Sequence, residues 1–235
     1  MYRKLPRPPR QPRMIRMSDQ TRGMTVTGIE PYPKGKGRVS VYLNDEFAFV
    51  LYKGELSKYD LDIGKNVNDE LYDRIMSETL YPRAKKRAMS LLKSMDRTEA
   101  DVRRKLSEGG YPSDVVDVAV DYLKSYHYID DSRYAAEYIR FKSSSMSRKQ
   151  IIAKLTEKGV PKAVIQESYD AFEEENGESA NSSERDLVEK LIKKRHPNGV
   201  GDIDYNAKQK LFAYLYGKGF SISLIEEVYS SLDIT

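Results

Sequence analysis

The 235-residue chain contains no cysteine, no tryptophan and only two histidines. The absence of cysteine excludes disulfides, a thiolate nucleophile and cysteine-ligated metal centres. No apolar run approaches the ~20 residues that a membrane-crossing helix needs, and the first residues lack the apolar stretch of a secretory signal. We therefore expect a cytoplasmic protein that does not enter a membrane.

Recognisable catalytic motifs are also missing. His127 and His196 are far apart in the sequence and fall in predicted loops, which favours surface positions for both. No HExxH motif, nucleophile elbow or glycine fingerprint occurs. The glycine-rich stretch at 33–38 lacks the spacing of a phosphate loop and precedes a predicted strand, so we interpret it as a turn. The sequence predicts a protein that is not an enzyme and that holds neither a metal ion nor a cofactor.

The composition is rich in charge and modest in apolar residues. Hydrophobic residues make up 39% and charged residues 32% of the chain, which favours small helical units in an elongated array over one thick core. Residues 1–22 hold seven basic residues and one acidic residue, and residues 83–160 hold seventeen basic and eleven acidic residues, so each segment has a net charge of +6. These two segments favour a polyanionic partner.

The first 23 residues predict a disordered basic tail, because they contain four prolines, seven cations and little apolar periodicity. Such a tail either binds nucleic acid or is a dispensable extension. The sequence leaves both interpretations open.

Residues 24–82 predict a small β-rich unit. Apolar and polar residues alternate from 38 to 52, which is typical of a β-hairpin, and 25–29 suits a third strand. A short helix is expected over 68–80, with Asn68 as its N-cap.

From Arg83 onward the chain is predicted to be helical and repeats itself. A shift of 49 residues superimposes two copies, in which Val102, Leu106, Gly110 and Pro112 meet Ile151, Leu155, Gly159 and Pro161. A further shift of 60 residues brings a looser third copy, with Leu211, Leu215, Gly219 and, in place of proline, Ser221. Self-similarity of this kind is typical of repeat proteins, in which each unit buries its face against its neighbours.

Each repeat is predicted to contain three helices, which makes nine in all. Thr98 and Ser147 are placed as N-caps, a glycine ends each second helix in the left-handed conformation, and a proline opens the next helix. Asp131, assisted by Asp130, is expected to cap the first helix of the second repeat. The predicted repeats span 83–130, 131–174 and 185–235, with an acidic linker at 175–184.

These residues resemble the RecX family, whose members regulate the bacterial recombinase RecA. The resemblance covers roughly residues 84–233 and rests on the order and spacing of "DRTEADVRRKLSEGGYPSDVVDVAVDYL", "YIDDSRYAAEYIRFK", "SRKQIIAKLTEKGVPKAVI" and "KQKLFAYLYGKGFSISLIEEV". The β-rich segment at 25–80 also resembles the N-terminal portion of longer family members. The resemblance implies a protein that docks in the groove of the RecA–single-stranded DNA filament and inhibits its ATPase, strand-exchange and coprotease activities. We expect it to act as a monomer.

Basic clusters are the candidate contacts with DNA phosphates or with an acidic filament surface. Such contacts fix position without reading sequence, and they weaken with salt. Cations near helix C-termini also favour the helix dipole, which is a structural explanation for the cluster at 193–195. The candidates are Lys85, Lys86, Arg87, Arg103, Arg104, Arg140, Lys142, Arg148, Lys149, Lys193, Lys194 and Arg195.

Tyrosine is abundant, with eighteen copies against six phenylalanines. Tyr122, Tyr138 and Tyr169 fall at core-like positions. Exposed rings can stack on single-stranded bases, although amphipathic packing is the simpler explanation for most of them. The tyrosines that suit exposed positions are Tyr126, Tyr128, Tyr134 and Tyr216.

Two other functions are consistent with the sequence. A general nucleic-acid-binding helical array would act without a recombinase, through the basic tail and the basic faces. A protein–protein scaffold would be indifferent to DNA. The response of binding to salt discriminates between these two.

Overall fold

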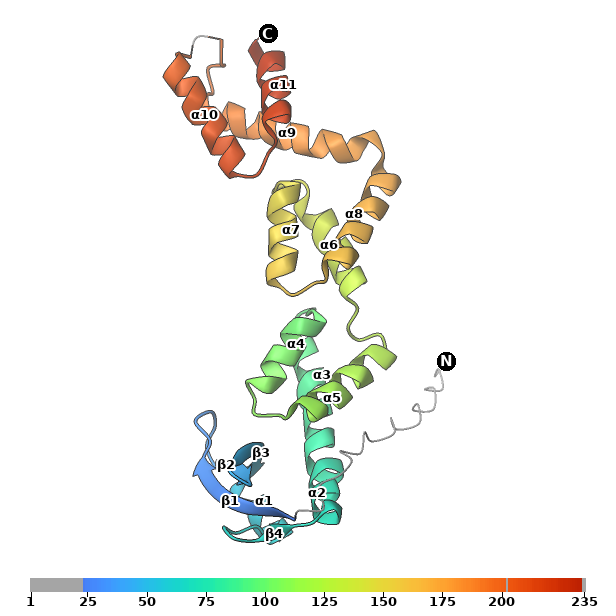
Figure 1. The fold of residues 1–235 in the computed structure, drawn as a ribbon. Helices are drawn as coiled ribbons and strands as arrows, with labels where there is room; N and C mark the ends of the chain where they lie inside the picture. The colour runs from blue at the N-terminus through green and yellow to red at the C-terminus, as the bar shows by residue number, and fades with distance from the viewer. Residues whose placement is uncertain (1–22, 202, 234–235) are drawn as a thin grey trace. The chain divides into compact units, whose positions relative to one another are not determined.

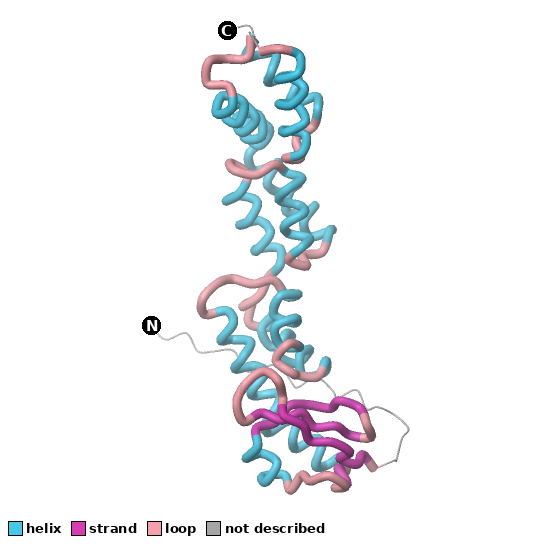
Figure 2. The backbone as a smooth tube through the Cα atoms, turned by 90° about the vertical axis from the view of Figure 1, so that its left-hand side faces the viewer, coloured by secondary structure: helices cyan, strands magenta, loops and turns pink. Residues whose placement is uncertain are grey.

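The computed structural model describes residues 23–201 and 203–233, and Figure 1 shows the order of their helices and strands. The predicted basic tail, apart from Gly23, lies outside the described residues. The chain divides into two compact units: unit 1 runs to Arg97 and resumes over Val102–Ile129, and unit 2 takes Thr98–Asp101 and everything from Asp130 onward. Among the described residues, the strands lie only in the N-terminal part of unit 1, as the magenta segments of Figure 2 show.

Four strands form one sheet in the order β3-β2-β1-β4. Their bounds are Met24–Pro31 for β1, Arg38–Leu43 for β2, Glu46–Tyr52 for β3 and Asn66–Val67 for β4. The predicted hairpin is confirmed: β2 and β3 pair antiparallel around Asn44 and Asp45, whose φ angles of 49° and 67° suit a tight type I′ turn. The predicted third strand is β1. The sequence patterns predicted neither β4 nor the short helix α1, Lys53–Tyr59.

An uninterrupted helical run leads from the sheet into the first repeat. It consists of α2 (Asp69–Ile75), a π-helical turn η1 (Met76–Leu80) and α3 (Tyr81–Leu92). Asn68 caps its start as predicted, since its side chain accepts a backbone hydrogen bond of 2.9 Å. The boundary predicted after residue 82 therefore falls inside this run. Pro82 has no N–H for a normal α-helical hydrogen bond, and the wider turn before it accommodates the proline.

Nine helices of the described chain form the three predicted repeats. Repeat 1 contains α3, α4 (Glu99–Ser107) and α5 (Ser113–Ser125); repeat 2 contains α6 (Asp131–Lys142), α7 (Arg148–Glu157) and α8 (Lys162–Asn176); repeat 3 contains α9 (Glu178–Arg195), α10 (Tyr205–Gly217) and α11 (Ile222–Asp233). Gly110, Gly159 and Gly219 have φ angles of 83°, 80° and 94°, which confirms the predicted left-handed stops.

The segment between the second and third repeats differs from the prediction. The acidic linker expected over 175–184 is helical except at Gly177, because α8 continues to Asn176 and α9 begins at Glu178. Three of the ten residues at 175–184 are glutamates, which are good helix formers, so polarity alone was a poor signal for a linker.

The N-cap of α6 is Asp130 and not Asp131. The Asp130 carboxylate accepts hydrogen bonds of 3.0 Å from two backbone N–H groups of the first turn. Asp131 accepts a hydrogen bond of 2.9 Å from the backbone N–H of Glu99. Both residues can cap a helix start, but Asp131 accepts the first backbone N–H of α4, a contact between segments that are distant in the sequence.

The hydrophobic clusters do not follow the predicted domain boundaries. In unit 1, buried residues of the sheet and of repeat 1 form a single cluster. In unit 2, repeat 2 and repeat 3 each have a cluster of their own. The β-rich part and repeat 1 therefore share one core. The positions matched between repeats are at most 1% exposed, namely Val102, Leu106, Ile151, Leu155, Leu211 and Leu215.

Within unit 2, the N-terminus of α7 meets the C-terminus of α10. The buried Ser147 hydroxyl donates a hydrogen bond of 2.7 Å to the carbonyl oxygen of Lys218, and it accepts one from the Gln150 N–H of its own helix. Gly219 lies against this contact, since a Cβ atom there would be 2.8 Å from Ser147 Oγ. We call this arrangement the α7–α10 joint. The N-terminal dipole of one helix faces the C-terminal dipole of the other, which is favourable.

The same contact recurs at the equivalent positions of the preceding repeat. The Thr98 hydroxyl donates to the carbonyl of Lys158 at 2.6 Å, and both residues belong to unit 2. In unit 1, the equivalent carbonyl is that of Gly109, which accepts a hydrogen bond from the Arg38 side chain of the sheet. The β-rich part thus satisfies in repeat 1 the carbonyl that a serine or threonine satisfies in the other two repeats.

Replacing Ser147 with alanine should lower the free energy of unfolding by about 1–3 kcal/mol, because α7 loses its N-cap and the Lys218 carbonyl loses its donor. Urea denaturation followed by circular dichroism measures this loss. The control is Ser145→Ala, because that exposed hydroxyl bonds only the Lys142 carbonyl of its own turn, so its loss should change stability by less than about 0.5 kcal/mol. Equal effects of the two variants would contradict the importance of the joint.

Candidate nucleic-acid interface

The twelve predicted basic residues are divided between the two units. Lys85, Lys86 and Arg87 lie on α3, and Arg103 and Arg104 lie on α4; these five belong to unit 1. The other seven belong to unit 2, where they lie on α6, α7 and α9: Arg140, Lys142, Arg148, Lys149, Lys193, Lys194 and Arg195. We group these cations by what their side chains contact, because a carboxylate and an aromatic ring change their charge differently.

Five of the twelve pair with carboxylates, and we call them the carboxylate-paired cations. Exposed ion pairs are worth only about 0–1 kcal/mol, so such pairs can open, but each carboxylate offsets the positive charge that attracts a phosphate. The pairs are Arg103–Asp117 (2.5 Å), Arg104–Glu108 (2.7 Å), Arg140–Glu175 (3.1 Å), Arg148–Glu173 and Lys193–Glu189 (2.5 Å).

Four others lie over aromatic rings, and we call them the ring-held cations. An aromatic face attracts a cation through its quadrupole without neutralising it, so these groups keep their full positive charge toward solvent. The distances from cation to ring centroid are 5.1 Å for Lys85–Tyr122, 4.9 Å for Lys142–Phe141, 5.9 Å for Lys149–Tyr216 and 4.4 Å for Arg195–Tyr214. Lys86, Arg87 and Lys194 are exposed.

Among the cations over aromatic rings that the sequence prediction missed, two occupy equivalent positions of successive repeats. Lys158 lies 5.8 Å from the ring centroid of Tyr134, and Lys218 lies 5.1 Å from that of Tyr214. Both are isolated lysines outside the basic clusters, which is why a search for clusters passed over them. The repeat could have identified these two lysines, because the 60-residue shift aligns Lys158 with Lys218, each directly before the glycine that ends a second helix.

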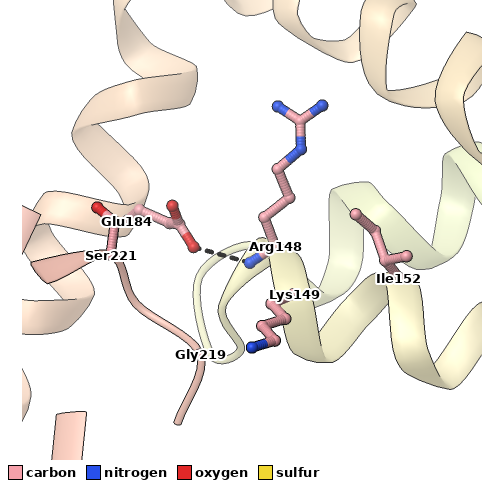
Figure 3. A pocket seen from close by; sticks show the side chains of 6 residues that line it. All are labelled: Arg148, Lys149, Ile152, Glu184, Gly219 and Ser221. Atoms are coloured by element: carbon pink, nitrogen blue, oxygen red, sulfur yellow. Dashed lines mark hydrogen bonds between the residues drawn. The ribbon is translucent and has the colours of Figure 1, made fainter. Parts of the chain in front are cut away.

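A shallow depression of about 280 Å³ opens beside the α7–α10 joint (Figure 3). The Arg148 and Lys149 side chains leave the start of α7 in different directions, and the Glu184 carboxylate accepts a hydrogen bond of 2.7 Å from the Arg148 backbone N–H. Its lining residues are Arg148, Lys149, Ile152, Glu184, Gly219 and Ser221. The lining of the depression therefore includes both the Lys149 ammonium group and the Glu184 carboxylate.

Arg148 also covers a buried tyrosine. Its guanidinium lies 4.6 Å from the ring centroid of Tyr169, whose hydroxyl is buried and has no hydrogen-bond partner among the described residues. Burial raises the pKa of the Tyr169 hydroxyl above its ordinary value, although the nearby Arg148 charge acts in the opposite direction. The Arg148 guanidinium therefore contacts both the ring of the buried Tyr169 and the Glu173 carboxylate.

The described residues contain no group of three or more histidine, aspartate or glutamate side chains that could hold a metal ion. His127 is exposed in the connection between α5 and α6, and His196 caps the end of α9, so both predicted loop positions are confirmed. None of the helices in the described ranges is both long and apolar enough to cross a membrane.

Family models match the chain in four consecutive segments. Residues 24–68 match the "Regulatory protein RecX N-terminal domain". Residues 84–123, 130–168 and 183–229 match the first, second and third three-helix domains of RecX. The matched segments correspond to the sheet and to the three repeats of the structure.

Individual relatives agree with these models over nearly their whole length. A "Regulatory protein RecX" of Clostridium acetobutylicum is 30% identical over 210 residues, which cover 88% of this chain and 96% of the relative. Another, from Clostridium botulinum strain Eklund 17B, is 28% identical and covers 86% and 93%. These relatives are named as regulatory proteins and not as enzymes.

Two solved structures share the fold. The crystal structure of a regulatory protein RecX has a TM-score of 0.57 at 26% identity and covers 88% of this chain and 99% of its own. RecX from Lactobacillus salivarius has a TM-score of 0.55 at 23% identity and covers 66% of this chain and 98% of its own. With its four domains matched in order and a relative at 30% identity along almost all of its length, the chain belongs to the RecX family of regulatory proteins.

Proposed function

We propose that this protein binds the filament of RecA recombinase on single-stranded DNA in the cytoplasm and inhibits its ATPase, strand-exchange and coprotease activities. It acts as a monomer, without catalysis of its own. The observation that carries the proposal is the match to proteins named regulatory protein RecX over the sheet and all three repeats.

The distribution of cations supports a filament as the partner. In unit 2, ring-held cations occur on α6, α7 and α9, which belong to two successive repeats. A filament offers the same acidic features again and again, and linked weak contacts to it gain affinity through effective concentration. Contacts to phosphates would fix the position of the protein without reading sequence.

The test is the single-strand-dependent ATPase of the cognate recombinase, titrated with this protein at two salt concentrations. We expect inhibition well below one protein per recombinase subunit, because one docked chain affects neighbouring subunits of the filament. The higher salt should shift the inhibition to higher protein concentrations. Unchanged ATPase activity at a molar excess of folded protein would rule the proposal out.

A second candidate function is general binding of nucleic acid without a recombinase. It is favoured by the exposed rings beside cations, since the Phe141 and Tyr216 side chains are 76% and 57% exposed. It predicts strong, salt-sensitive binding to bare DNA, weaker binding after deletion of residues 1–23, and no effect on the recombinase ATPase. The ATPase titration therefore separates the two functions.

A further inference from the structure

Lys149 and Tyr216 lie side by side although they are far apart in the sequence. Lys149 is the second residue of α7, and Tyr216 lies in the last turn of α10. The Lys149 Nζ atom is 5.9 Å from the centroid of the Tyr216 ring, and both side chains are exposed. An exposed aromatic ring beside an ammonium group is the pairing that single-stranded nucleic acids use, with the base on the ring and the phosphate at the cation.

The α7–α10 joint holds this pair in place. The hydrogen bond from Ser147 to the Lys218 carbonyl ties the residue before α7 to the residue that directly follows α10. The backbone of Gly219 also approaches the stem of Lys149, since a Cβ atom on that glycine would lie 3.0 Å from Lys149 Cβ. The ring and the cation therefore need little reordering to bind, which lowers the entropic cost of association.

The local charge favours an anion. Lys149 has no ion pair among the described residues, and the Glu173 carboxylate is paired with the guanidinium of the preceding residue, Arg148. The Glu184 carboxylate is held by the Arg148 backbone N–H. Lys149 is one of the residues that line the depression shown in Figure 3. A phosphate at Lys149 would thus meet an ammonium group that need not leave an ion pair to bind it.

We infer that Lys149 and Tyr216 form a contact site for single-stranded nucleic acid, in which an unpaired base stacks on the Tyr216 ring and the adjoining phosphate binds the Lys149 ammonium. A base in a duplex has both faces covered by its neighbours, so the site selects single strands. The inference deepens the proposed function, because a filament contains such a strand, but it is tested on the strand alone. An acidic protein surface would also form an ion pair with Lys149, but it has no base to stack on the Tyr216 ring.

The experiment measures fluorescence anisotropy of labelled oligothymidylate of about 20 nucleotides, and of an abasic strand of the same length, with the full chain. Tyr216→Ala should weaken thymidylate binding about 5- to 150-fold and abolish the preference over the abasic strand. Tyr216→Phe keeps a ring and should retain the preference. Lys149→Gln should weaken binding to both strands and reduce the slope of log K against log salt by about 0.7.

Two matched variants control for loss of an exposed ring and of a charge. Tyr205→Ala removes a ring that is 74% exposed on the same helix, at its other end. Lys154→Gln removes a lysine of α7 that pairs with Glu157 at 2.8 Å. Both should bind oligothymidylate like the unaltered protein. Circular dichroism and thermal melts check that every variant is folded.

Several results would overturn the inference. It is wrong if Tyr216→Ala loses equal affinity for both strands, or if Tyr216→Phe behaves like Tyr216→Ala. It is also wrong if the variants bind oligothymidylate normally but no longer inhibit the recombinase, since the pair would then contact protein. The variants could lose affinity for the single strand as predicted while the unaltered protein fails to inhibit the ATPase. In that case the contact site is supported and only the proposed function is wrong.

Discussion

Replacing Gly219 with alanine should lower the free energy of unfolding by about 2–5 kcal/mol. A left-handed conformation costs an alanine about 1–2 kcal/mol, and Gly219 has a φ of 94°. The new Cβ would also lie 2.8 Å from the Ser147 hydroxyl and 3.0 Å from Lys149 Cβ. Relieving that overlap costs about 1–3 kcal/mol more, because Ser147 cannot move without releasing the Lys218 carbonyl.

Gly199 provides a matched control for this prediction. Its φ is also 94°, but a Cβ atom there would meet nothing within 4 Å. Gly199→Ala should therefore show only the conformational cost of about 1–2 kcal/mol. Urea denaturation of both variants, followed by circular dichroism, measures the difference. Equal losses would mean that the close approach at the α7–α10 joint contributes nothing.

Neutralising the three ring-held cations that were predicted in unit 2 should raise the protein concentration needed for half-maximal ATPase inhibition on the order of 10- to 100-fold. The variant carries Lys142→Gln, Lys149→Gln and Arg195→Gln. Removing one cation that binds a phosphate of a single strand weakens binding by roughly fourfold at ~0.15 M salt, and the effects of three such changes multiply. Lys149 and Arg195 are exposed and Lys142 is partly exposed, so the variant should fold normally.

The control for this prediction removes the same number of charges from positions that pair with carboxylates. Arg140, Lys154 and Lys193 pair with Glu175, Glu157 and Glu189, and their replacement with glutamine changes the net charge by the same three units. We expect a much smaller loss of inhibition, because these charges are already offset. If both triple variants lose inhibition equally, total charge governs binding and the ring-held positions have no special role.

Local signals were enough to predict the repeat. A glycine at a left-handed stop, a serine or threonine at an N-cap and a pair of apolar residues one turn apart each act within a few residues, so their recurrence after 49 and 60 residues reports the architecture directly. The hairpin was predictable for the same reason, since Asn44 and Asp45 both tolerate positive φ. Resemblance to the RecX family rested on the same positions.

Other features depend on segments that meet only in the folded chain. A boundary was predicted after residue 82, yet a π turn before Pro82 carries the helical run past it into the core that repeat 1 shares with the sheet. Asp131 suggested a cap for its own helix, yet its carboxylate accepts the Glu99 N–H of α4. In both cases a correct local preference was outweighed by packing against an element distant in the sequence.

The order of amino acids alone was enough to predict a triplicated helical array with a β-rich start, in which basic residues are the candidate contacts. Which of those residues pair with carboxylates from distant segments followed from the folded chain. Arg148 meets a carboxylate because α8 brings Glu173 to it, whereas Lys149, the next residue, meets a ring because α10 ends beside α7. Charge is a property of each residue, but its neutralisation depends on its neighbours. For Arg104 and Lys193 the partner carboxylate lies one turn away in the sequence, whereas for Arg148 and Lys149 the neighbours come from other helices and are chosen by helix packing.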